Sequence, residues 1–359
     1  MGQRPNAQGL DLNRDHMKLD SPEARSFVRM MTAYDPHVAV DLHTTNGTRH
    51  AYHLTYSPPL HPNTPDVIDD LLRIEWLPAV TRRVEAKHGW RYYYYGNHDP
   101  RRPGWYTFDH RPRFNNNYIG LRNRIAILSE AYAYLTFRER VLATLYFVEE
   151  ILEYAQEHAA RLRRVVEEAD AEGVIGRPLA TRATFQRSPG EVTILLGEVE
   201  EERHPYTGEI VLRRRDVEIP TSMYEYGSFT ATETEVAPEA YFILPRAPEA
   251  LERARAHGLT VLPVSPDEER TLQRFRIDST RVADRPFQGR RERTLFGTWE
   301  VTREALPDGT MLVPVQQPLG RLAFTLLEPR SDDGLASWAL LDDTVDGGRY
   351  PILRAPAGG

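Results

Sequence analysis

Two short apolar segments, far apart in the sequence, each lead into a side chain that can bind a metal or move a proton. Residues 38–42 lead into His43, and residues 125–129 lead into Glu130. Imidazole is the commonest protein metal ligand, and a carboxylate can take up and return a proton. Each residue alone also fits a plainer interpretation: a core or surface histidine, and an ion-paired or helix-capping glutamate. Their meaning depends on where the two segments lie in the fold.

Both segments are typical of buried strands. Short apolar runs bounded by polar or turn-forming residues favour strands over helices. In an open α/β sheet, ligands bind at the carboxyl ends of the strands. If the two strands are neighbours, His43 and Glu130 therefore share one crevice.

A third group of candidates lies in the polar N-terminal loop, residues 4–14. The loop carries Arg4 and Arg14, with Asn13 beside the second. A guanidinium group can bind a carboxylate or a polarised carbonyl through two parallel donors. Because such a loop needs neighbours on both sides to hold it, we expect that Met1 is not the natural start of this domain.

Helices and irregular segments alternate around the two strands. Capping residues, prolines and apolar spacing predict helices over residues 21–35, 65–88 and 137–170. Residues 44–63 and 91–121 are irregular and rich in aromatic side chains. Long loops inside a compact domain are usually functional, so we expect the second of them to cover a site.

After about residue 180 the sequence changes to short strand-like runs separated by turns. The pattern predicts strands at residues 192–196, 209–212, 240–244 and 299–301, and helices at 248–257 and about 266–274. We expect an α/β protein whose residues 1–178 form an open, mixed, largely parallel sheet with helices on both faces. A smaller α/β or β-rich accessory domain would follow over residues 179–359.

Composition excludes several classes of function. Of the 359 residues, 40% are hydrophobic and 27% are charged, as in ordinary globular proteins. The net charge of −7 gives no broad basic field for nucleic acid. The sequence has no cysteine, so a metal site must use His, Asp or Glu. No apolar run approaches the roughly 20 residues of a membrane helix, and the N-terminus has no signal-peptide pattern.

Three motifs, in this order, resemble those of the zinc carboxypeptidases, the metallocarboxypeptidases related to digestive carboxypeptidase A and to the regulatory carboxypeptidases. Residues 9–14 read GLDLNR and look like the family's G-[VIL]-D-L-N-R box. Residues 41–43 read DLH, similar to the strand that carries the last zinc ligand. Residues 128–130 read LSE, similar to the strand that carries the catalytic glutamate. The resemblance covers residues 1 to about 155 and implies a carboxypeptidase-like fold that is incomplete at its N-terminus.

The resemblance implies a role for each matching residue. His43 would be a zinc ligand, and Glu130 the general base that takes a proton from a zinc-activated water and passes it to the leaving amine. Asn13 and Arg14 would grip the terminal carboxylate of the substrate. Arg4 would stabilise the oxyanion.

The aromatic loop over residues 91–118 would cover the site by the same resemblance. Tyr106 is our candidate for the family's mobile substrate-side tyrosine, with Tyr118 and the four tyrosines at 92–95 as competitors. The asparagines at 115–117 lie about where the family places its side-chain pocket.

One part of the family's metal site has no counterpart in the sequence. A catalytic zinc takes three protein ligands, and the family supplies two of them from a His-x-x-Glu motif ahead of the Asn-Arg box. No such motif precedes Asn13. The chain is a fragment or a gene model begun at an internal Met, or a short homologue that has lost zinc, or a protein that recruits other ligands. The histidines available for recruitment are His50, His53, His61, His98 and His110.

We therefore expect a zinc-dependent metallocarboxypeptidase in its complete form, cleaving a C-terminal peptide or related amide bond, with this chain lacking two zinc ligands. The alternative is a non-catalytic module that binds carboxylate-terminated peptides or small molecules through Arg4, Asn13 and Arg14. The expected partner is a peptide or small amide with a free C-terminal carboxylate, and neither nucleic acid nor a membrane. We expect a soluble protein, cytoplasmic or secreted, whose N-terminal signal region is absent.

Overall fold

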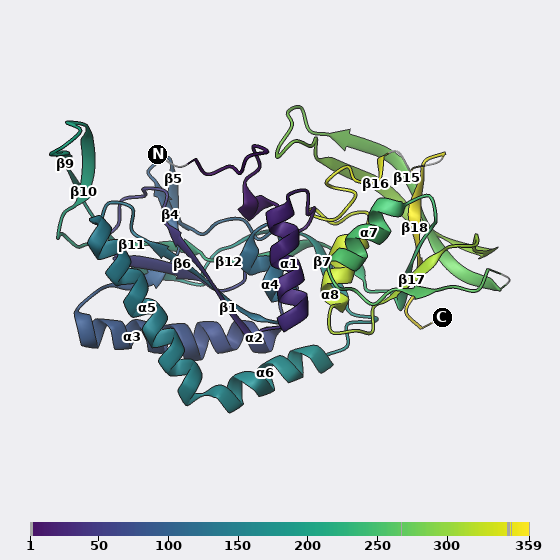
Figure 1. Ribbon diagram of the computed structural model, residues 1–359, viewed down its shortest axis with the longest axis horizontal. Coiled ribbons are helices and arrows are strands. Elements are labelled where there is room, and N and C mark those ends of the chain that lie inside the picture. Colours follow the sequence, from purple (N-terminus) through teal and green to yellow (C-terminus); the bar gives the residue numbers. More distant parts are fainter. Residues whose placement is uncertain (1–2, 267, 343–344, 346, 359) are drawn as a thin grey trace.

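The structure, a computed structural model, describes residues 3–266, 268–342, 345 and 347–358 (Figure 1). Met1, which the sequence suggested as an internal start, lies outside the described residues. The helical elements are η1 (Leu12–Arg14), α1 (Pro22–Tyr34), α2 (Asp66–Asp70), η2 (Leu71–Trp76), α3 (Leu77–His88), α4 (Asn115–Leu121), α5 (Phe137–Glu157), α6 (Ala159–Ala171), α7 (Pro248–Ala256) and α8 (Gly320–Leu327).

The strands of the first half are β1 (Val38–Thr44), β2 (Leu54–Ser57), β3 (Tyr92–Tyr94), β4 (Asn97–Asp99), β5 (Arg102–Tyr106) and β6 (Ile125–Ala131). Those of the second half are β7 (Pro178–Gln186), β8 (Glu191–Leu196), β9 (Val199–Arg203), β10 (Ile210–Arg214), β11 (Ile219–Tyr226), β12 (Ser228–Val236), β13 (Ala240–Ile243), β14 (Leu262–Pro263), β15 (Glu269–Val282), β16 (Arg293–Ala305), β17 (Met311–Pro314) and β18 (Arg349–Ala355).

Helix α1 leads the chain into the strand that carries His43. Ser21 caps the helix, with its hydroxyl accepting the backbone N–H of Ala24 at 3.2 Å, and Pro22 occupies the first turn. Asp35 ends the helix in the left-handed conformation, with φ at 44°. The predicted helix and the predicted strand β1 after it are both confirmed.

The sheet that carries both candidate residues has the strand order β1-β6-β2-β3. Strand β1 runs parallel to β6, β2 runs antiparallel to β6, and β3 runs parallel to β2. The sheet is therefore mixed, as predicted. Among the described residues, β1 pairs with β6 alone and forms one edge of the sheet.

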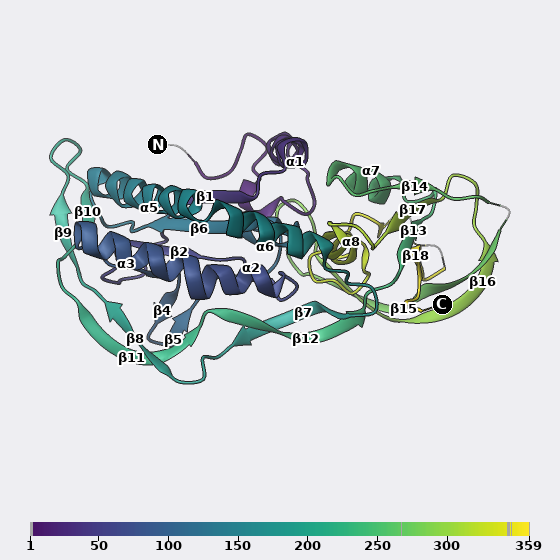
Figure 2. The same cartoon turned by 90° about the horizontal axis from the view of Figure 1, so that it is seen from below.

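Helices cover both faces of this sheet, again as predicted. Ile125 and Ile127 turn to one face, where they share a core with α2, α3, α5 and α6. Ala126 turns to the other face and packs in the core that contains Val28 of α1 and Tyr118 of α4. The alternation follows from the two-residue period of a strand. Figure 2 shows α3, α5 and α6 lying along one side of the sheet.

Three segments of the first half differ in detail from the sequence prediction. The helix predicted over residues 65–88 is formed by α2, η2 and α3, with a π-helical turn at Leu71–Trp76. The helix predicted over residues 137–170 is divided into α5 and α6 at His158, whose φ and ψ are −114° and 18°. The irregular stretch 91–121 contains β3, β4, β5 and α4.

The second half is rich in strands, as expected. Its largest sheet has the order β14-β17-β13-β18-β15-β16 and packs against α7 and α8. The helix predicted at about residues 266–274 is wrong, because strand β15 begins at Glu269. The segment pairs with β16 and β18 and buries Leu272 and Phe275. Long-range pairing therefore outweighs the local helix signal at this position.

The two halves share a sheet and a core. Strand β5 of the first half pairs in parallel with β11 of the second. One core cluster contains Val28 of α1, Ala250 of α7 and Phe324 of α8, and Figure 1 shows α1 beside α7 and α8. The boundary between residues 178 and 179 stays a prediction.

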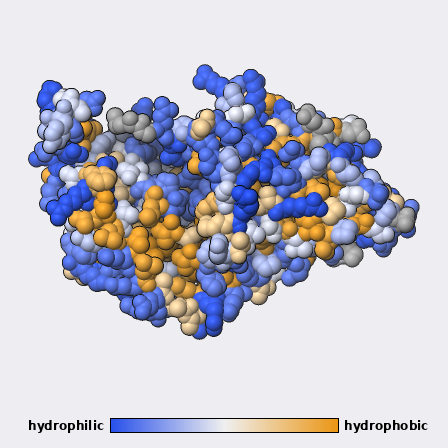
Figure 3. Space-filling model, in the orientation of Figure 1, coloured by the Kyte–Doolittle hydropathy of each residue, from blue (hydrophilic) through white to orange (hydrophobic). Residues whose placement is uncertain are grey.

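The outer face of α5 carries exposed apolar side chains. Val141, Leu145 and Leu152 are 50%, 45% and 62% exposed, and Figure 3 shows hydrophobic residues gathered over the part of the surface that contains α5. Within the described residues, no helix has both the length and the apolar composition needed to cross a membrane.

Candidate active site

His43 and Glu130 lie directly opposite one another on neighbouring strands. Strands β1 and β6 are parallel, and their register pairs His43 with Glu130. Paired residues of adjacent strands point to the same face of the sheet. The two side chains therefore share one crevice, as the sequence predicted for neighbouring strands.

A cavity of about 360 Å³ opens at this end of the sheet. It is lined by Arg4, Asn13, Arg14, His43, Thr44, Thr45, Asn46, Tyr95, Phe108, Phe114, Asn116, Leu128 and Glu130. The structure thus brings together all of the predicted site residues except Tyr106. The lining of the cavity includes two guanidinium groups, one carboxylate and one imidazole. The cavity is therefore suited to a ligand with both an anionic end and a polar reacting group.

Asp11 organises the loop that carries the arginines. Its Oδ1 accepts the backbone N–H of Asn13 at 3.0 Å and caps the short helix η1. Its Oδ2 accepts a hydrogen bond from Arg4 Nε at 2.7 Å. The backbone N–H of Asp11 donates to Gln288 Oε1 at 2.7 Å. The second half of the chain therefore helps to hold the loop in place.

The Arg14 side chain is fixed against an aromatic ring. Its guanidinium carbon lies 3.9 Å from the centre of the Phe114 ring, and its Nη1 donates to the Asn13 carbonyl at 2.5 Å. Burial lowers the pKa of Arg14, and Asp11 partly offsets this effect. A guanidinium group that is held against a ring in this way loses little further side-chain freedom when it binds an anion.

The carboxyl group of Glu130 takes up a proton more readily than an ordinary glutamate does. Burial raises its pKa to about 7; Asp41 adds to the rise, while His43 and Arg4 oppose it. Its Oε2 atom is buried with no hydrogen-bond partner among the described residues. A carboxyl group with such a pKa can both accept and donate a proton near pH 7.

The imidazole of His43 lies between two carboxylates. Burial acts to lower the pKa of His43, but Asp41 and Glu130 outweigh it and raise the pKa above its ordinary value. Nε2 lies 2.9 Å from Asp41 Oδ2, an ion-pair distance, yet this atom has no partner with hydrogen-bond geometry among the described residues.

The described residues do not form a three-ligand zinc site. A catalytic zinc takes three protein ligands, but no group of three or more His, Cys, Asp or Glu side chains in this part of the chain is placed to hold a metal ion. His43 Nε2 already lies 2.9 Å from Asp41 Oδ2, and Glu130 Oε2 is a buried atom without a hydrogen-bond partner among the described residues. Of the three ligands that the resemblance implies, the described residues include His43.

The five histidines that the sequence offered for recruitment lie away from the cavity that holds His43 and Glu130. None of the five that the sequence offered lines the cavity as the described residues form it. The His50 ring packs at a tilt of 35° against Tyr132, with ring centres 4.1 Å apart, and burial lowers the pKa of His50 to about 3. His53 stacks on Trp90 at 4.8 Å.

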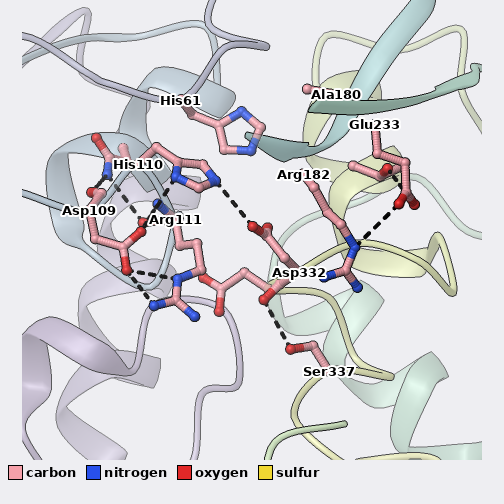
Figure 4. A network of polar contacts seen from close by, with 12 residues as sticks. His61, Asp109, His110, Arg111, Ala180, Arg182, Glu233, Asp332 and Ser337 are labelled. Atoms are coloured by element: carbon pink, nitrogen blue, oxygen red, sulfur yellow. Dashed lines mark hydrogen bonds and ion pairs between the residues drawn. The ribbon is translucent and has the colours of Figure 1, made fainter. Parts of the chain in front are cut away.

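His61 and His110 belong to a separate network where the two halves meet (Figure 4). His110 Nε2 lies 3.1 Å from Asp332 Oδ2, and its Nδ1 lies 3.5 Å from Asp109 Oδ1. The His61 ring is 5.8 Å from that of His110. The backbone N–H of Asp332 donates to Thr181 at 3.0 Å, so the network ties the segment before α4 to the second half.

Tyr106 lies outside the cavity. Its ring stacks on Tyr226 at 4.1 Å, and the guanidinium group of Arg102 covers it at 3.6 Å. Tyr95 lines the cavity instead, where its hydroxyl accepts a hydrogen bond from Asn97 Nδ2 at 3.2 Å. The assignment of Tyr106 as the substrate-side tyrosine stays a prediction, and the geometry favours Tyr95 for contact with a ligand.

The three consecutive asparagines before Glu130 have different places. Asn116 lines the cavity. Asn115 and Asn117 bind other parts of the protein: Asn115 contacts Asn13, and Asn117 accepts the N–H of Leu60 at 2.8 Å. The sequence does not indicate which of the three asparagines lines the cavity, because the directions of their side chains depend on helix α4, which begins at Asn115.

Comparison with known proteins finds distant relatives that are named Carboxypeptidase 2. Two fungal proteins named Carboxypeptidase 2, from Trichophyton tonsurans and Trichophyton equinum, are each 22% identical to this chain over 373 aligned residues. The protein of the same name from Trichophyton rubrum is 23% identical over 374. Each alignment covers 98% of this chain but 66% of the relative, so the chain spans just under two thirds of their length. No protein-family model and no solved structure matches. The similarity is distant but extends over nearly the whole chain.

Proposed function

We propose that the cavity binds the C-terminal end of a peptide, or of a related small amide, through its free carboxylate, as part of a carboxypeptidase-type hydrolase site. The observation that carries the proposal is the convergence of Arg14, Asn13 and Arg4 on the cavity that also holds Glu130. The similarity to proteins named Carboxypeptidase 2 supports the same reaction class.

The donors around the cavity suit a carboxylate. The guanidinium group of Arg14 has a fork of N–H groups that matches the two oxygens of a carboxylate. Hydrogen bonds to a charged group contribute about 1.5–3 kcal/mol each. Arg4, at 57% side-chain exposure, is the more open of the two arginines. It is the candidate to stabilise charge that develops on a carbonyl oxygen.

We assign proton transfer to Glu130. Its pKa of about 7 allows it to take a proton from an attacking water and to pass it to the leaving amine at neutral pH. Its Oε2 is the buried atom without a hydrogen-bond partner among the described residues, so it is free to make such a bond to water.

A catalytic zinc at this site would need ligands in addition to His43. His43 would be one ligand, but the described residues provide no three-ligand group. A catalytic zinc would need two further protein ligands. Binding of a terminal carboxylate does not need these ligands, whereas hydrolysis by a zinc-activated water does.

A second candidate function follows from that mismatch. Without a complete ligand set, the same cavity would act as a non-catalytic module that binds carboxylate-terminated peptides or small molecules. The donors Arg4, Asn13 and Arg14 would serve both functions. The two functions differ in metal content and in turnover.

Both differences can be measured on the same purified protein. Zinc is determined by elemental analysis after dialysis, and N-benzoylglycyl-L-phenylalanine is tested for binding by calorimetry and for hydrolysis. About one zinc per chain, lost in His43→Ala, together with turnover that is lost in Glu130→Gln, would support the enzyme. Binding without zinc or turnover would support the module. A protein that is folded and binds no carboxylate-terminated peptide would contradict both.

A further inference from the structure

We propose that His16 is a positioning residue that fixes the Asn13 carboxamide so that Asn13 turns its N–H₂ group, and not its oxygen, into the cavity. The inference rests on the proposed carboxylate-binding function and assigns a cause to its selectivity. His16 does not line the cavity that holds Glu130, and acts on Asn13 through Asn115.

The direction of the Asn13 amide follows from its partner. Asn13 Oδ1 receives the backbone N–H of Asn115 at 2.8 Å. A backbone N–H can only donate, so the oxygen of the amide must face it. The Nδ2 group is then turned away from that N–H, and Asn13 lines both the cavity that holds Glu130 and a neighbouring cavity that His16 also lines. We infer that Nδ2 serves the cavity of Glu130.

The direction of the Asn115 side chain follows in the same way from His16. His16 Nδ1 lies 3.2 Å from the carbonyl oxygen of Arg113, which can only accept, so Nδ1 carries the hydrogen. The ring is 6% exposed, and burial lowers the pKa of His16, which keeps the ring neutral. Nε2 is therefore an acceptor. His16 Nε2 accepts a hydrogen bond from Asn115 Nδ2 at 2.9 Å.

Asn115 is thus held at two points. Its backbone N–H holds Asn13, and its side chain is anchored on His16. The His16 ring is itself fixed by an edge-on contact with Phe27 at 5.4 Å and a tilted contact with Tyr118 at 5.8 Å. A binding group keeps its geometry when the residues behind it are locked by packing and hydrogen bonds.

The direction of the Asn13 amide affects which ligands the cavity binds, a charged carboxylate or an uncharged amide. With Nδ2 facing the cavity that Arg14 also lines, Asn13 adds a hydrogen-bond donor there and favours an anionic terminal carboxylate. With the amide reversed, its oxygen would face that carboxylate and repel it. His16 therefore contributes to discrimination between a free carboxylate and an uncharged amide.

Two amide substitutions, His16→Asn and His16→Gln, separate the positioning of Asn13 from a general contribution of His16 to the fold. The glutamine amide can place its oxygen near the Nε2 position of a histidine and accept from Asn115, whereas the shorter asparagine reaches only the Nδ1 position. The probes are N-benzoylglycyl-L-phenylalanine and its C-terminal amide, measured by calorimetry. We expect His16→Asn to weaken binding of the acid about tenfold while binding of the amide is unchanged. We expect His16→Gln to restore the acid to within about threefold of the unsubstituted protein.

Equal weakening by both substitutions, or equal weakening of acid and amide, would overturn the inference. If His16→Asn does not fold, Asn115→Ala replaces it, because that variant keeps the backbone N–H on Asn13 but cuts the link to His16. The same loss of preference for the acid is expected.

An NMR measurement of the His16 tautomer tests the inference without any ligand. The ¹⁵N shifts of His16 in the unsubstituted protein should show the Nδ1–H tautomer at neutral pH, and the Nε2–H tautomer would overturn the inference. An unsubstituted protein that binds acid and amide equally well would instead contradict the proposed function, whatever the tautomer.

Discussion

The carboxylate of Asp11 accepts a hydrogen bond from Arg4 Nε at 2.7 Å, so the first arginine of the N-terminal loop is tied to the start of helix η1. The other oxygen of Asp11 caps the N–H of Asn13 at 3.0 Å. One side chain thus places two of the three candidate carboxylate donors. Because it lies beside the cavity rather than in it, Asp11 can be changed without removing any proposed ligand contact.

Replacing Asp11 with alanine should weaken carboxylate binding more than it weakens the fold. Loss of the cap costs about 1 kcal/mol of stability, and an ion pair as open as this one, at 57% and 16% side-chain exposure, adds less than about 1 kcal/mol. Affinity for N-benzoylglycyl-L-phenylalanine should fall about fivefold, since Arg4 loses its partner and the backbone of Asn13 loses its cap. Glu202→Gln, which breaks the exposed pair with Arg213 in the β9–β10 hairpin, is the control. Unchanged affinity in Asp11→Ala would show that the loop is held by other contacts.

Replacing Arg113 with leucine should destabilise the whole protein. Arg113 Nε donates to Asp333 Oδ1 at 2.8 Å, and the two residues are 2% and 0% exposed. Removing one partner of a buried pair leaves an uncompensated charge and costs about 3–5 kcal/mol. Urea unfolding followed by circular dichroism measures the loss.

The matched control for Arg113 is Arg83→Leu, which breaks a solvent-exposed pair with Glu157 at 30% and 51% side-chain exposure. This variant should lose less than about 1 kcal/mol. Similar losses in both variants would contradict the view that Asp333 and Arg113 join the two halves through a buried ion pair.

Stability should fall in mild acid because of His257. Burial, with Arg122 and Arg253 nearby, lowers the pKa of His257 to about 3. Its ring is fully buried between the Tyr118 hydroxyl at 2.9 Å and the Met17 carbonyl at 3.0 Å. A histidine with a lowered folded-state pKa binds protons more readily when unfolded. Its contribution is therefore complete above its ordinary pKa and is lost as pH falls toward 3.

The size of that contribution follows from the two pKa values. Between pH 7 and pH 5, His257 should account for about 2 kcal/mol of lost unfolding free energy. His257→Gln, which cannot take up a proton in this range, should show a shallower decline by that amount in urea titrations at the two pH values. Parallel declines in the variant and the unsubstituted protein would show that His257 is protonated in the folded state.

Much of the site could be predicted from the sequence, because its residues lie at the ends of recognisable elements. The apolar runs before His43 and Glu130 are both strands, and the loop that carries Arg14 reaches the same cavity. The sequence did not show that β1 and β6 are neighbours in register, because strand pairing depends on contacts between residues far apart in the chain.

The parts that could not be predicted depend on tertiary packing. Tyr106 and Tyr95 lie in the same aromatic segment, and only the pairing of β5 with β11 turns Tyr106 toward Tyr226 and away from the cavity. The segment that begins at Glu269 carries helix-favouring residues but becomes a strand because β16 and β18 pair with it. The role of His16 had no sequence signal, since its partner Asn115 is 99 positions away.

The most direct test of this account compares the affinity of N-benzoylglycyl-L-phenylalanine with that of its C-terminal amide, by calorimetry, in the unsubstituted protein and in Arg14→Gln. The matched control is Arg102→Gln, because Arg102 also covers an aromatic ring, that of Tyr106, but lies outside the cavity. The account predicts at least about tenfold preference for the acid, lost in Arg14→Gln and kept in Arg102→Gln. Equal affinity for acid and amide in the unsubstituted protein would contradict it.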